Sequence, residues 1–284
     1  MFWWCRWSIN LPHEEAAITG IQRITQAFKS ANLRRSAALM PYYTLGYPDQ
    51  QISLDVIEAI SPFSDLIELG VPFSDPIADG PTIQRSTQIA LKNGTNSVRC
   101  LEMVKELRQQ RGIPTPILLM GYYNPIIAYG EEKFIRDAAH AGVDGLIIPD
   151  LPIEEAGSLA KQSKESGLSL VYFLAPTSYI QRIRQVITLA NGFIYIVSVT
   201  GITGARSQVS ADIRTFVESV KTMSDIPIAV GFGISTPEQA FEISNYADGI
   251  IFGSALIDIV ENSDDKPEAA AAFVRSMGLG LNTI

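Results

Sequence analysis

The sequence predicts a single (β/α)8 TIM barrel with an extra helix at its N-terminal end. Eight apolar runs alternate with helical patterns along the 284 residues, and no change in composition divides the chain. Most of these runs are apolar at consecutive positions, which is typical of parallel strands covered on both faces. The rival fold is a doubly wound open sheet, which usually has a glycine-rich turn after its first strand. The segment YTLGYPD at 43–49 is not such a turn.

Each element follows from its local pattern. The opening helix, 21–33, has apolar residues at helical spacing, and a gap between 69 and 117 leaves room for an additional helical stretch. The predicted strands are 37–44, 65–69, 117–122, 145–149, 168–175, 193–199, 226–232 and 249–253. The predicted helices between and after them are 53–60, 97–108, 132–142, 153–167, 179–192, 211–223, 236–247 and 266–277. Thr236 with Pro237 reads as a helix start, and the tail from 278 to 284 is expected to be frayed.

Composition excludes several classes of function. The net charge of −8 and the lack of clustered Lys and Arg argue against nucleic-acid binding. No run approaches the ~20 apolar residues of a membrane helix. The two cysteines, Cys5 and Cys100, form no metal spacing and suit a reducing cytoplasm, or a plastid if the source is a plant or alga. The two histidines, His13 and His140, lie away from strand ends, which disfavours a zinc site or a catalytic triad.

The first 17 residues are rich in Trp and have no signal-peptide pattern, because Arg6 interrupts their only apolar run. We therefore expect residues 1–17 to be a disordered or loosely docked extension and residues 18–284 to form the barrel domain.

The candidate catalytic acids lie in and after the second predicted strand. Glu68 interrupts an apolar run, and partial burial is expected to raise its pKa above the usual ~4.3, toward values useful for proton transfer. Asp75 and Asp79 follow in a loop rich in Pro and Gly. Asp79 is expected to stay ionised, so that two carboxyl groups in different environments divide the acid and base roles. Turn formation is the alternative role for both aspartates, more so for Asp75.

Glycines follow the sixth, seventh and eighth predicted strands, in the segments TGITGAR, GFG and Gly253–Ser254. They allow backbone N–H groups to approach a ligand, and Ser254 could cap a short helix whose N-terminus attracts an anion. This is where such barrels commonly bind phosphate. The alternative is that the glycines only form tight turns.

Missing residue types narrow the chemistry. No lysine lies in a predicted strand, so Schiff-base chemistry is disfavoured, and no His ligand is available for a metal-dependent aldolase. What remains is acid–base chemistry on a phosphorylated substrate, with walls from Tyr122, Tyr195 and Phe232.

Four segments together resemble the α subunit of tryptophan synthase: IELGVPFSDPIADGPTIQ from Ile67, YIVSVTGITGAR from Tyr195, GFGIS from Gly231 and IIFGSAL from Ile250. The resemblance extends from about Ile21 to Met277, and the first segment is the most specific. It implies a lyase of L-tryptophan biosynthesis that cleaves indole-3-glycerol phosphate to indole and glyceraldehyde 3-phosphate. It also implies a β-subunit partner in an α2β2 heterotetramer, with pyridoxal phosphate on the partner and no cofactor or metal on this chain.

The resemblance also assigns roles to residues. Glu68 and Asp79 match the catalytic pair, and Tyr195 matches the active-site tyrosine. Other matching positions are Thr203 and Gly204 in a closing loop, Gly233, Gly253 and Ser254 in a phosphate cradle, and the segment from Pro72 to Asp79, with Asp75 as its relay to the β subunit. Open alternatives are a stand-alone lyase of secondary metabolism, a non-catalytic barrel that activates a β subunit, and another phosphate-binding barrel enzyme. One such enzyme, indole-3-glycerol phosphate synthase, would need a lysine at a strand end.

Overall fold

The structure is a computed structural model that describes residues 18–197, 206–231 and 233–281. Its strands form one closed barrel in chain order, and every neighbouring pair is parallel, including β8 with β1. The strands are β1 (Ala38–Thr44), β2 (Ile67–Gly70), β3 (Ile117–Met120), β4 (Gly145–Ile147), β5 (Ser169–Leu174), β6 (Ile194–Val197), β7 (Ile228–Gly231) and β8 (Gly249–Phe252). The predicted TIM barrel is confirmed, and each strand overlaps a predicted run. The predicted extension, residues 1–17, lies outside the described residues.

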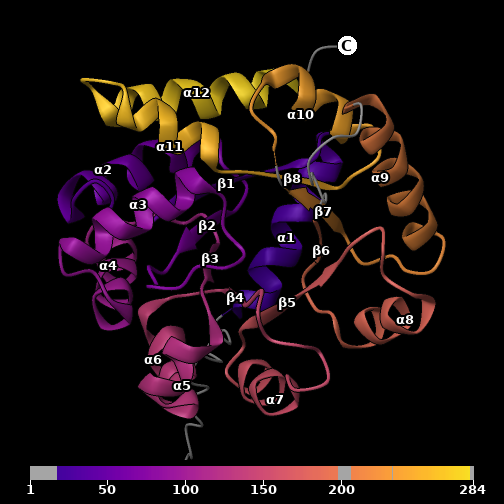
Figure 1. The fold of residues 1–284 in the computed structure, drawn as a ribbon, viewed down its shortest axis with the longest axis horizontal. Helices are drawn as coiled ribbons and strands as arrows, with labels where there is room; N and C mark the ends of the chain where they lie inside the picture. Colours follow the sequence, from indigo (N-terminus) through magenta and orange to yellow (C-terminus); the bar gives the residue numbers. More distant parts are fainter. Residues whose placement is uncertain (1–17, 198–205, 232, 282–284) are drawn as a thin grey trace, which may run out of the picture.

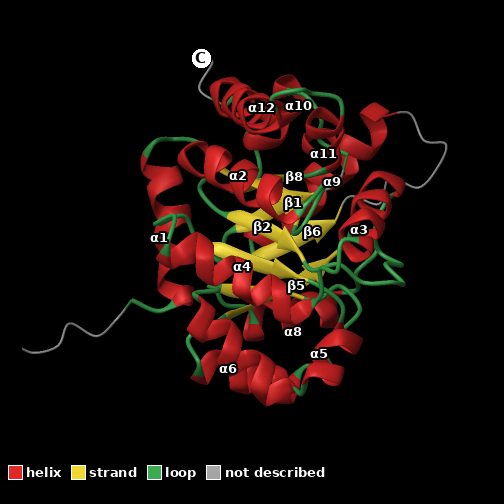
Figure 2. Ribbon diagram, turned by 90° about the vertical axis from the view of Figure 1, so that its left-hand side faces the viewer, coloured by secondary structure: helices red, strands yellow, loops and turns green. Residues whose placement is uncertain are grey.

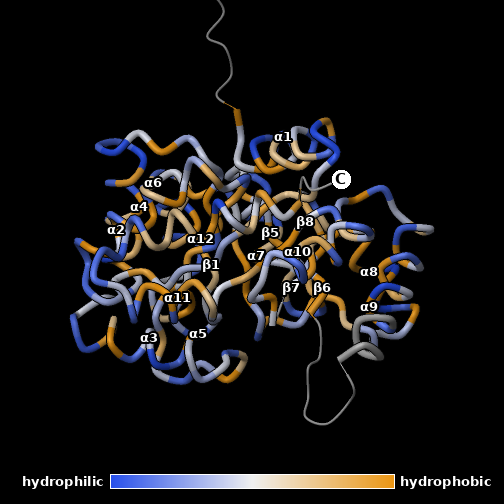
Figure 3. Tube along the Cα trace, turned by 90° about the horizontal axis from the view of Figure 1, so that it is seen from above, coloured by the Kyte–Doolittle hydropathy of each residue, from blue (hydrophilic) through white to orange (hydrophobic). Residues whose placement is uncertain are grey.

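Helices surround the barrel (Figure 2). They are α1 (Gly20–Leu33), α2 (Gln50–Ile60), the 3-10 turn η1 (Ser61–Phe63), α3 (Pro81–Lys92), α4 (Ser97–Gln109), α5 (Tyr123–Tyr129), α6 (Glu131–Ala141), α7 (Gly157–Glu165), α8 (Ile180–Leu189), α9 (Arg206–Lys221), α10 (Pro237–Ser244), α11 (Ser254–Glu261) and α12 (Lys266–Gly280). Seen from above, the strands are largely hydrophobic and the surrounding helices carry the hydrophilic segments (Figure 3). Within the described residues, no helix has both the length and the apolar character needed to cross a membrane.

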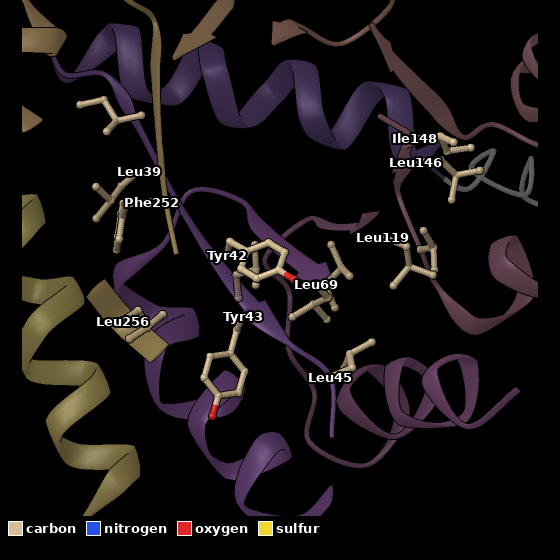
Figure 4. Packing of buried hydrophobic residues seen from close by; sticks show 14 of the residues in the cluster. Leu39, Tyr42, Tyr43, Leu45, Leu69, Leu119, Leu146, Ile148, Phe252 and Leu256 are labelled. Carbon is tan, nitrogen blue, oxygen red and sulfur yellow. The ribbon is translucent and has the colours of Figure 1, made fainter. Parts of the chain in front are cut away.

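Neighbouring residues of β1 face opposite sides of the barrel wall. Met40 belongs to the apolar cluster inside the barrel, and Leu39 belongs to the cluster between strands and helices. Tyr42 and Tyr43 follow the same alternation and point in different directions (Figure 4). Both clusters are buried, so every residue of β1 is buried. This explains why the strand shows no alternation of apolar and polar residues in the sequence.

Helix α1 closes the N-terminal end of the barrel, where it crosses the centre of the view in Figure 1. It begins with a capping box between Thr19 and Gln22. Ile24 and Phe28 belong to the inner apolar cluster, and the ring of Phe28 lies 5.4 Å from that of Phe193. With this end filled by side chains, the barrel interior opens toward the carboxyl ends of the strands.

A buried ion network ties α1 and α4 to the start of β3 and β4. The carboxylate of Asp144, only 2% exposed as a residue, contacts Arg108 at 2.5 Å and Arg23 at 3.1 Å, and accepts the Ile117 N–H at 2.7 Å. The negative charge of Asp144 is paired with the positive charges of Arg23 and Arg108, as a buried charge requires. We therefore assign this network to the fold and not to the chemistry.

Several predicted boundaries are wrong; for example, α2 begins at Gln50 and not at Ser53, and α9 begins at Arg206 and not at Ala211. No helix was predicted between the third strand and residue 132, but the segment after β3 forms α5, whose first N–H, that of Tyr123, donates to the Asp150 carboxylate at 2.9 Å. Helix α7 begins at Gly157, after a turn, and not at Ile153. The tail is not frayed up to residue 281, because α12 continues to Gly280 and Leu281 is 7% exposed. At α5 and at the C-terminal end of α12, tertiary contacts override local propensity.

Candidate active site

A cavity of about 650 Å³ opens at the carboxyl ends of the strands, the end opposite α1. Glu68 and Asp79 both line this cavity. The other lining residues are mostly apolar or aromatic and come from nearly every strand end: Tyr42, Ala78, Gly80, Ile83, Met120, Pro149, Phe173, Tyr195, Val197, Gly233, Ile234, Ser235, Ile251, Phe252, Gly253, Ser254 and Ala255. A largely apolar cavity with a few convergent polar groups is the usual form of a small-molecule site.

Glu68 lies on β2, in register with Tyr42 on β1 and with Leu118 on β3. The residue is 2% exposed, and its Oε2 has no hydrogen-bond partner within the described residues. Burial, and after it the nearby charge of Asp79, raises the pKa of Glu68 to about 8. An unpaired carboxyl in such a place holds its proton at neutral pH, which suits a general acid.

Asp79 lies in the loop between β2 and α3 and is held by one tyrosine. The hydroxyl of Tyr122 donates to Asp79 Oδ2 at 3.1 Å, and the side chain of Gln84 donates to the Asp79 carbonyl at 2.9 Å. Burial raises the pKa of Asp79 to about 6, and the Tyr122 hydrogen bond opposes this rise. At pH 7 the two carboxyl groups therefore differ in protonation, with Asp79 mostly charged and Glu68 mostly neutral.

Tyr122 lies behind the cavity, although we expected it to form a wall. It is 3% exposed and is not among the lining residues. Besides donating to Asp79, its hydroxyl accepts the Ala78 N–H at 3.0 Å, and its ring lies 5.3 Å from that of Phe73. The residue therefore fixes the loop that carries Asp79.

Tyr195 lines the cavity from β6, and its ring lies 4.9 Å from that of Phe173 on β5. A Cβ on Gly231 would lie 2.3 Å from the Tyr195 hydroxyl, so this glycine makes room for the phenol. We did not predict Phe173 or Tyr42 as site residues. Their strands are buried on both faces, so the residue types do not show which side chains point into the barrel. Only the geometric rule that successive side chains of a strand face opposite sides could have indicated this.

Two of the predicted glycines, Gly233 and Gly253, line the cavity. Gly233 has a φ of +73°, which favours glycine, and a Cβ there would meet no atom within 4 Å. The suggestion that Ser254 caps the following helix is wrong, because Gly253 is the N-cap residue of α11 and no side chain caps it. A Cβ on Gly253 would lie 2.8 Å from the ring of Tyr42, so this glycine also accommodates an aromatic side chain.

Three predicted site residues, Thr203, Gly204 and Phe232, lie outside the described residues. The two residues predicted to face a partner differ in exposure. Pro72 is buried within this chain, whereas Asp75 is exposed and accepts the Ser74 hydroxyl at 2.5 Å.

A second cavity of about 450 Å³ lies at the opposite end, between α1 and the start of β8, and its lining cations include Lys29, Arg35 and Lys221. Lys221 is already paired with Asp248 at 2.7 Å. Within the described ranges, no three His, Cys, Asp or Glu side chains gather as metal ligands would.

The fold and the cavity define an acid–base enzyme built on a (β/α)8 barrel, with two carboxyl groups of different pKa inside an apolar site. A sequence model of the family described as "Tryptophan synthase alpha chain" matches residues 28–279. The chain belongs to this family. It is a carbon–carbon lyase that cleaves indole-3-glycerol phosphate to indole and glyceraldehyde 3-phosphate.

Known proteins of similar sequence and structure support membership of this family. The tryptophan synthase alpha chain of Citrifermentans bemidjiense is 50% identical over 264 residues, which covers 92% of this chain and 98% of the relative. That of Chloroflexus aggregans is 46% identical over 262 residues, covering 90% and 97%. A crystal structure of tryptophan synthase subunit alpha from Legionella pneumophila superposes with a TM-score of 0.85 at 35% identity, covering 92% of this chain and 99% of that one.

Proposed function

We propose that Glu68 is the proton donor of the cleavage and that Asp79 stabilises the positive charge that develops on the indole ring. The observation that carries the proposal is the buried, unpaired carboxyl of Glu68 in the same cavity as a second carboxyl, which Tyr122 holds in place.

The reaction needs two proton movements. Glu68 gives its proton to the ring carbon that bears the glycerol phosphate chain, and the ring becomes a cationic indolenine. Asp79 accepts the indole N–H in a hydrogen bond, which favours this cation. The carboxylate of Glu68 then takes the proton of the adjacent hydroxyl. The carbon–carbon bond breaks, its electron pair restores the aromatic indole, and an aldehyde is left. Glu68 ends the cycle protonated, as it began.

We propose that the phosphate of the substrate binds at the carboxyl ends of β7 and β8. Gly233, Gly253 and Ser254 lie there, and the N-terminus of α11 brings backbone N–H groups to the cavity wall. We propose that these residues form the phosphate cradle, together with Thr203 and Gly204, and that Phe232 adds an aromatic wall. The indole ring then lies deeper, between Tyr42, Phe173 and Tyr195.

Membership of this family implies a β subunit as partner. We propose an α2β2 complex in which pyridoxal phosphate belongs to the β subunit, and we place the contact at the cavity end of the barrel. Large apolar side chains are exposed there in three connections: Ile77 after β2 (83% exposed), Ile127 on α5 (56%) and Tyr179 after β5 (61%). We name these three residues the partner surface; Pro72 and Asp75 belong to the same loop as Ile77. Exposed apolar groups on one face favour an interface.

The decisive experiment replaces Glu68 by Gln. Indole release is expected to fall to background, with or without a β subunit, while binding of glycerol 3-phosphate measured by calorimetry changes little. The matched control is Glu102→Gln on the exposed face of α4, which should keep the parent rate. Indole formation by Glu68→Gln at the parent rate would sink the assignment.

The same assay separates the two open alternatives. Full activity of the parent chain without a β subunit would favour a stand-alone lyase. No indole in the presence of an active β subunit would favour a non-catalytic activator.

A further inference from the structure

Three buried hydroxyl groups connect the cavity to α3. Tyr42 Oη lies 3.5 Å from Thr44 Oγ1, which in turn lies 2.7 Å from Ser86 Oγ. The hydroxyl of Ser86 donates to the Ile83 carbonyl at 2.8 Å. Thr44 and Ser86 are 0% exposed, and Tyr42 is 5% exposed. Bulk water therefore does not compete for these hydrogen bonds.

The carbonyl at the end fixes the direction of the whole chain. A hydroxyl has one proton, and a carbonyl only accepts. The proton of Ser86 is used on Ile83, so Ser86 must accept from Thr44. The proton of Thr44 is then also used, so Thr44 must accept from Tyr42. The phenolic proton of Tyr42 consequently points to Thr44, two residues further along β1.

Glycines fix the position of this phenol. A Cβ on Gly70, at the end of β2, would lie 2.0 Å from Tyr42 Oη, and a Cβ on Gly253 would lie 2.8 Å from the Tyr42 ring. The ring is therefore packed against the backbone of β2 and of the β8–α11 turn. Any other residue at either position would push the phenol out of its place.

The phenol belongs to the group of side chains that surrounds Glu68. Tyr42 is in register with Glu68, and both line the cavity. The titratable groups that face Glu68 are Tyr42 from β1, Asp79 from the loop after β2 and Tyr195 from β6. Among the described lining residues there is no Lys, Arg or His. The hydroxyl of Tyr42 is thus one of the few hydrogen-bond donors that could stabilise the carboxylate of Glu68.

We propose that Tyr42 is a positioning residue, whose proton is held by Thr44 and Ser86 and is therefore withheld from Glu68, whose Oε2 has no hydrogen-bond partner within the described residues. A phenol that donated a hydrogen bond to Glu68 would favour the carboxylate and lower the pKa of Glu68. The hydroxyl chain therefore keeps Glu68 able to give its proton. This inference rests on the proposed role of Glu68 as proton donor.

Replacing Ser86 by Ala tests the proposal, because Ser86 is not a lining residue of the cavity. Without Ser86, Thr44 has a free proton and the phenol can turn its own proton to Glu68. The alkaline limb of the pH profile of kcat/KM for indole release should then move down by about one pH unit, the size expected of one hydrogen bond to a charged group. In Ser86→Ala/Tyr42→Phe the limb should return to its position in Tyr42→Phe alone.

Two results would overturn the proposal: an alkaline limb that stays in place in Ser86→Ala, or one that moves equally when the phenol is absent. If Ser86→Ala fails to fold, Thr44→Val removes the neighbouring hydroxyl at similar volume and should give the same shift.

A measurement without substrate separates this inference from the proposed function. The infrared band of the protonated Glu68 carboxyl, identified by its loss in Glu68→Gln, is followed against pH in the parent and in Ser86→Ala. Its midpoint should fall in the variant, and an unchanged midpoint contradicts the inference. A parent chain that releases no indole contradicts only the proposed function.

Discussion

Glu68 is a residue at which stability and chemistry oppose each other. It occupies a buried position on β2 with no partner for Oε2, a place where an apolar side chain would be expected. The sequence was enough to predict that an acid is buried here, because a lone acid in an apolar strand is rare. The sequence could not identify Tyr42 or Phe173, since both lie in strands with no polar face to mark the inward direction.

The raised pKa of Glu68 predicts a gain in stability on neutralisation. The folded-state pKa, about 8, lies above the ordinary value of 4.5, so burying Glu68 becomes less favourable as the pH rises from 4.5 toward 8. Glu68→Gln should therefore raise the free energy of unfolding at pH 7, on the order of 2 kcal/mol. Urea unfolding at pH 5 and pH 7 measures this, and the gain should shrink at pH 5. A variant less stable than the parent at pH 7 would contradict the burial argument.

At the scale of elements, the glycines at the ends of β7 and β8 make room for phenols: Tyr195 lies against Gly231 and Tyr42 against Gly253. We predicted glycines at these strand ends for a phosphate cradle, and that role remains a proposal. Contacts between side chains and backbone of distant strands are not readable from one local segment. Helix α5 was missed for the same reason, since the carboxylate that caps its start, Asp150, belongs to the next βα connection.

Gly253→Ala tests whether the β8–α11 turn serves both the proposed phosphate cradle and the packing of Tyr42. The new Cβ would lie 2.8 Å from the ring of Tyr42, so the ring or the N-terminus of α11 must shift. We expect KM for the phosphorylated substrate to rise by about tenfold or more, equivalent to about 1.4 kcal/mol of lost binding. Gly157→Ala is the matched control, because a Cβ there meets no atom within 4 Å and the residue begins α7. Steady-state kinetics and a thermal melt of both variants measure these effects. An unchanged KM in Gly253→Ala would show that the new Cβ does not disturb the binding of the substrate.

On the scale of the whole molecule, the two ends of the barrel have different tasks. Helix α1 and the Asp144 network fill and tie the N-terminal end, while the loops at the other end hold the acids and the cavity. Continuous apolar runs and helical spacing were enough to predict the barrel, and with it a site at the carboxyl ends of the strands. That α1 fills the other end was not predicted. The network itself could not be predicted, since Arg23, Arg108 and Asp144 come from separate segments and look like ordinary surface charges in the sequence.

The partner surface predicts that binding of the β subunit can be lost without loss of the fold. Ile127 is 56% exposed on α5, at the cavity end, so Ile127→Asp adds a charge that solvent can hydrate in the free chain. Buried against a partner, the same charge would be desolvated, which costs several kcal/mol. We expect indole release by the isolated chain and its melting temperature to stay near parent values, while activation by the β subunit and co-elution with it are lost. Leu33→Asp is the matched control: Leu33 is 84% exposed at the end of α1, at the far end of the barrel, and its replacement should leave activation intact. Loss of activation in both variants, or in neither, would show that the partner surface at the cavity end is not the contact with the β subunit.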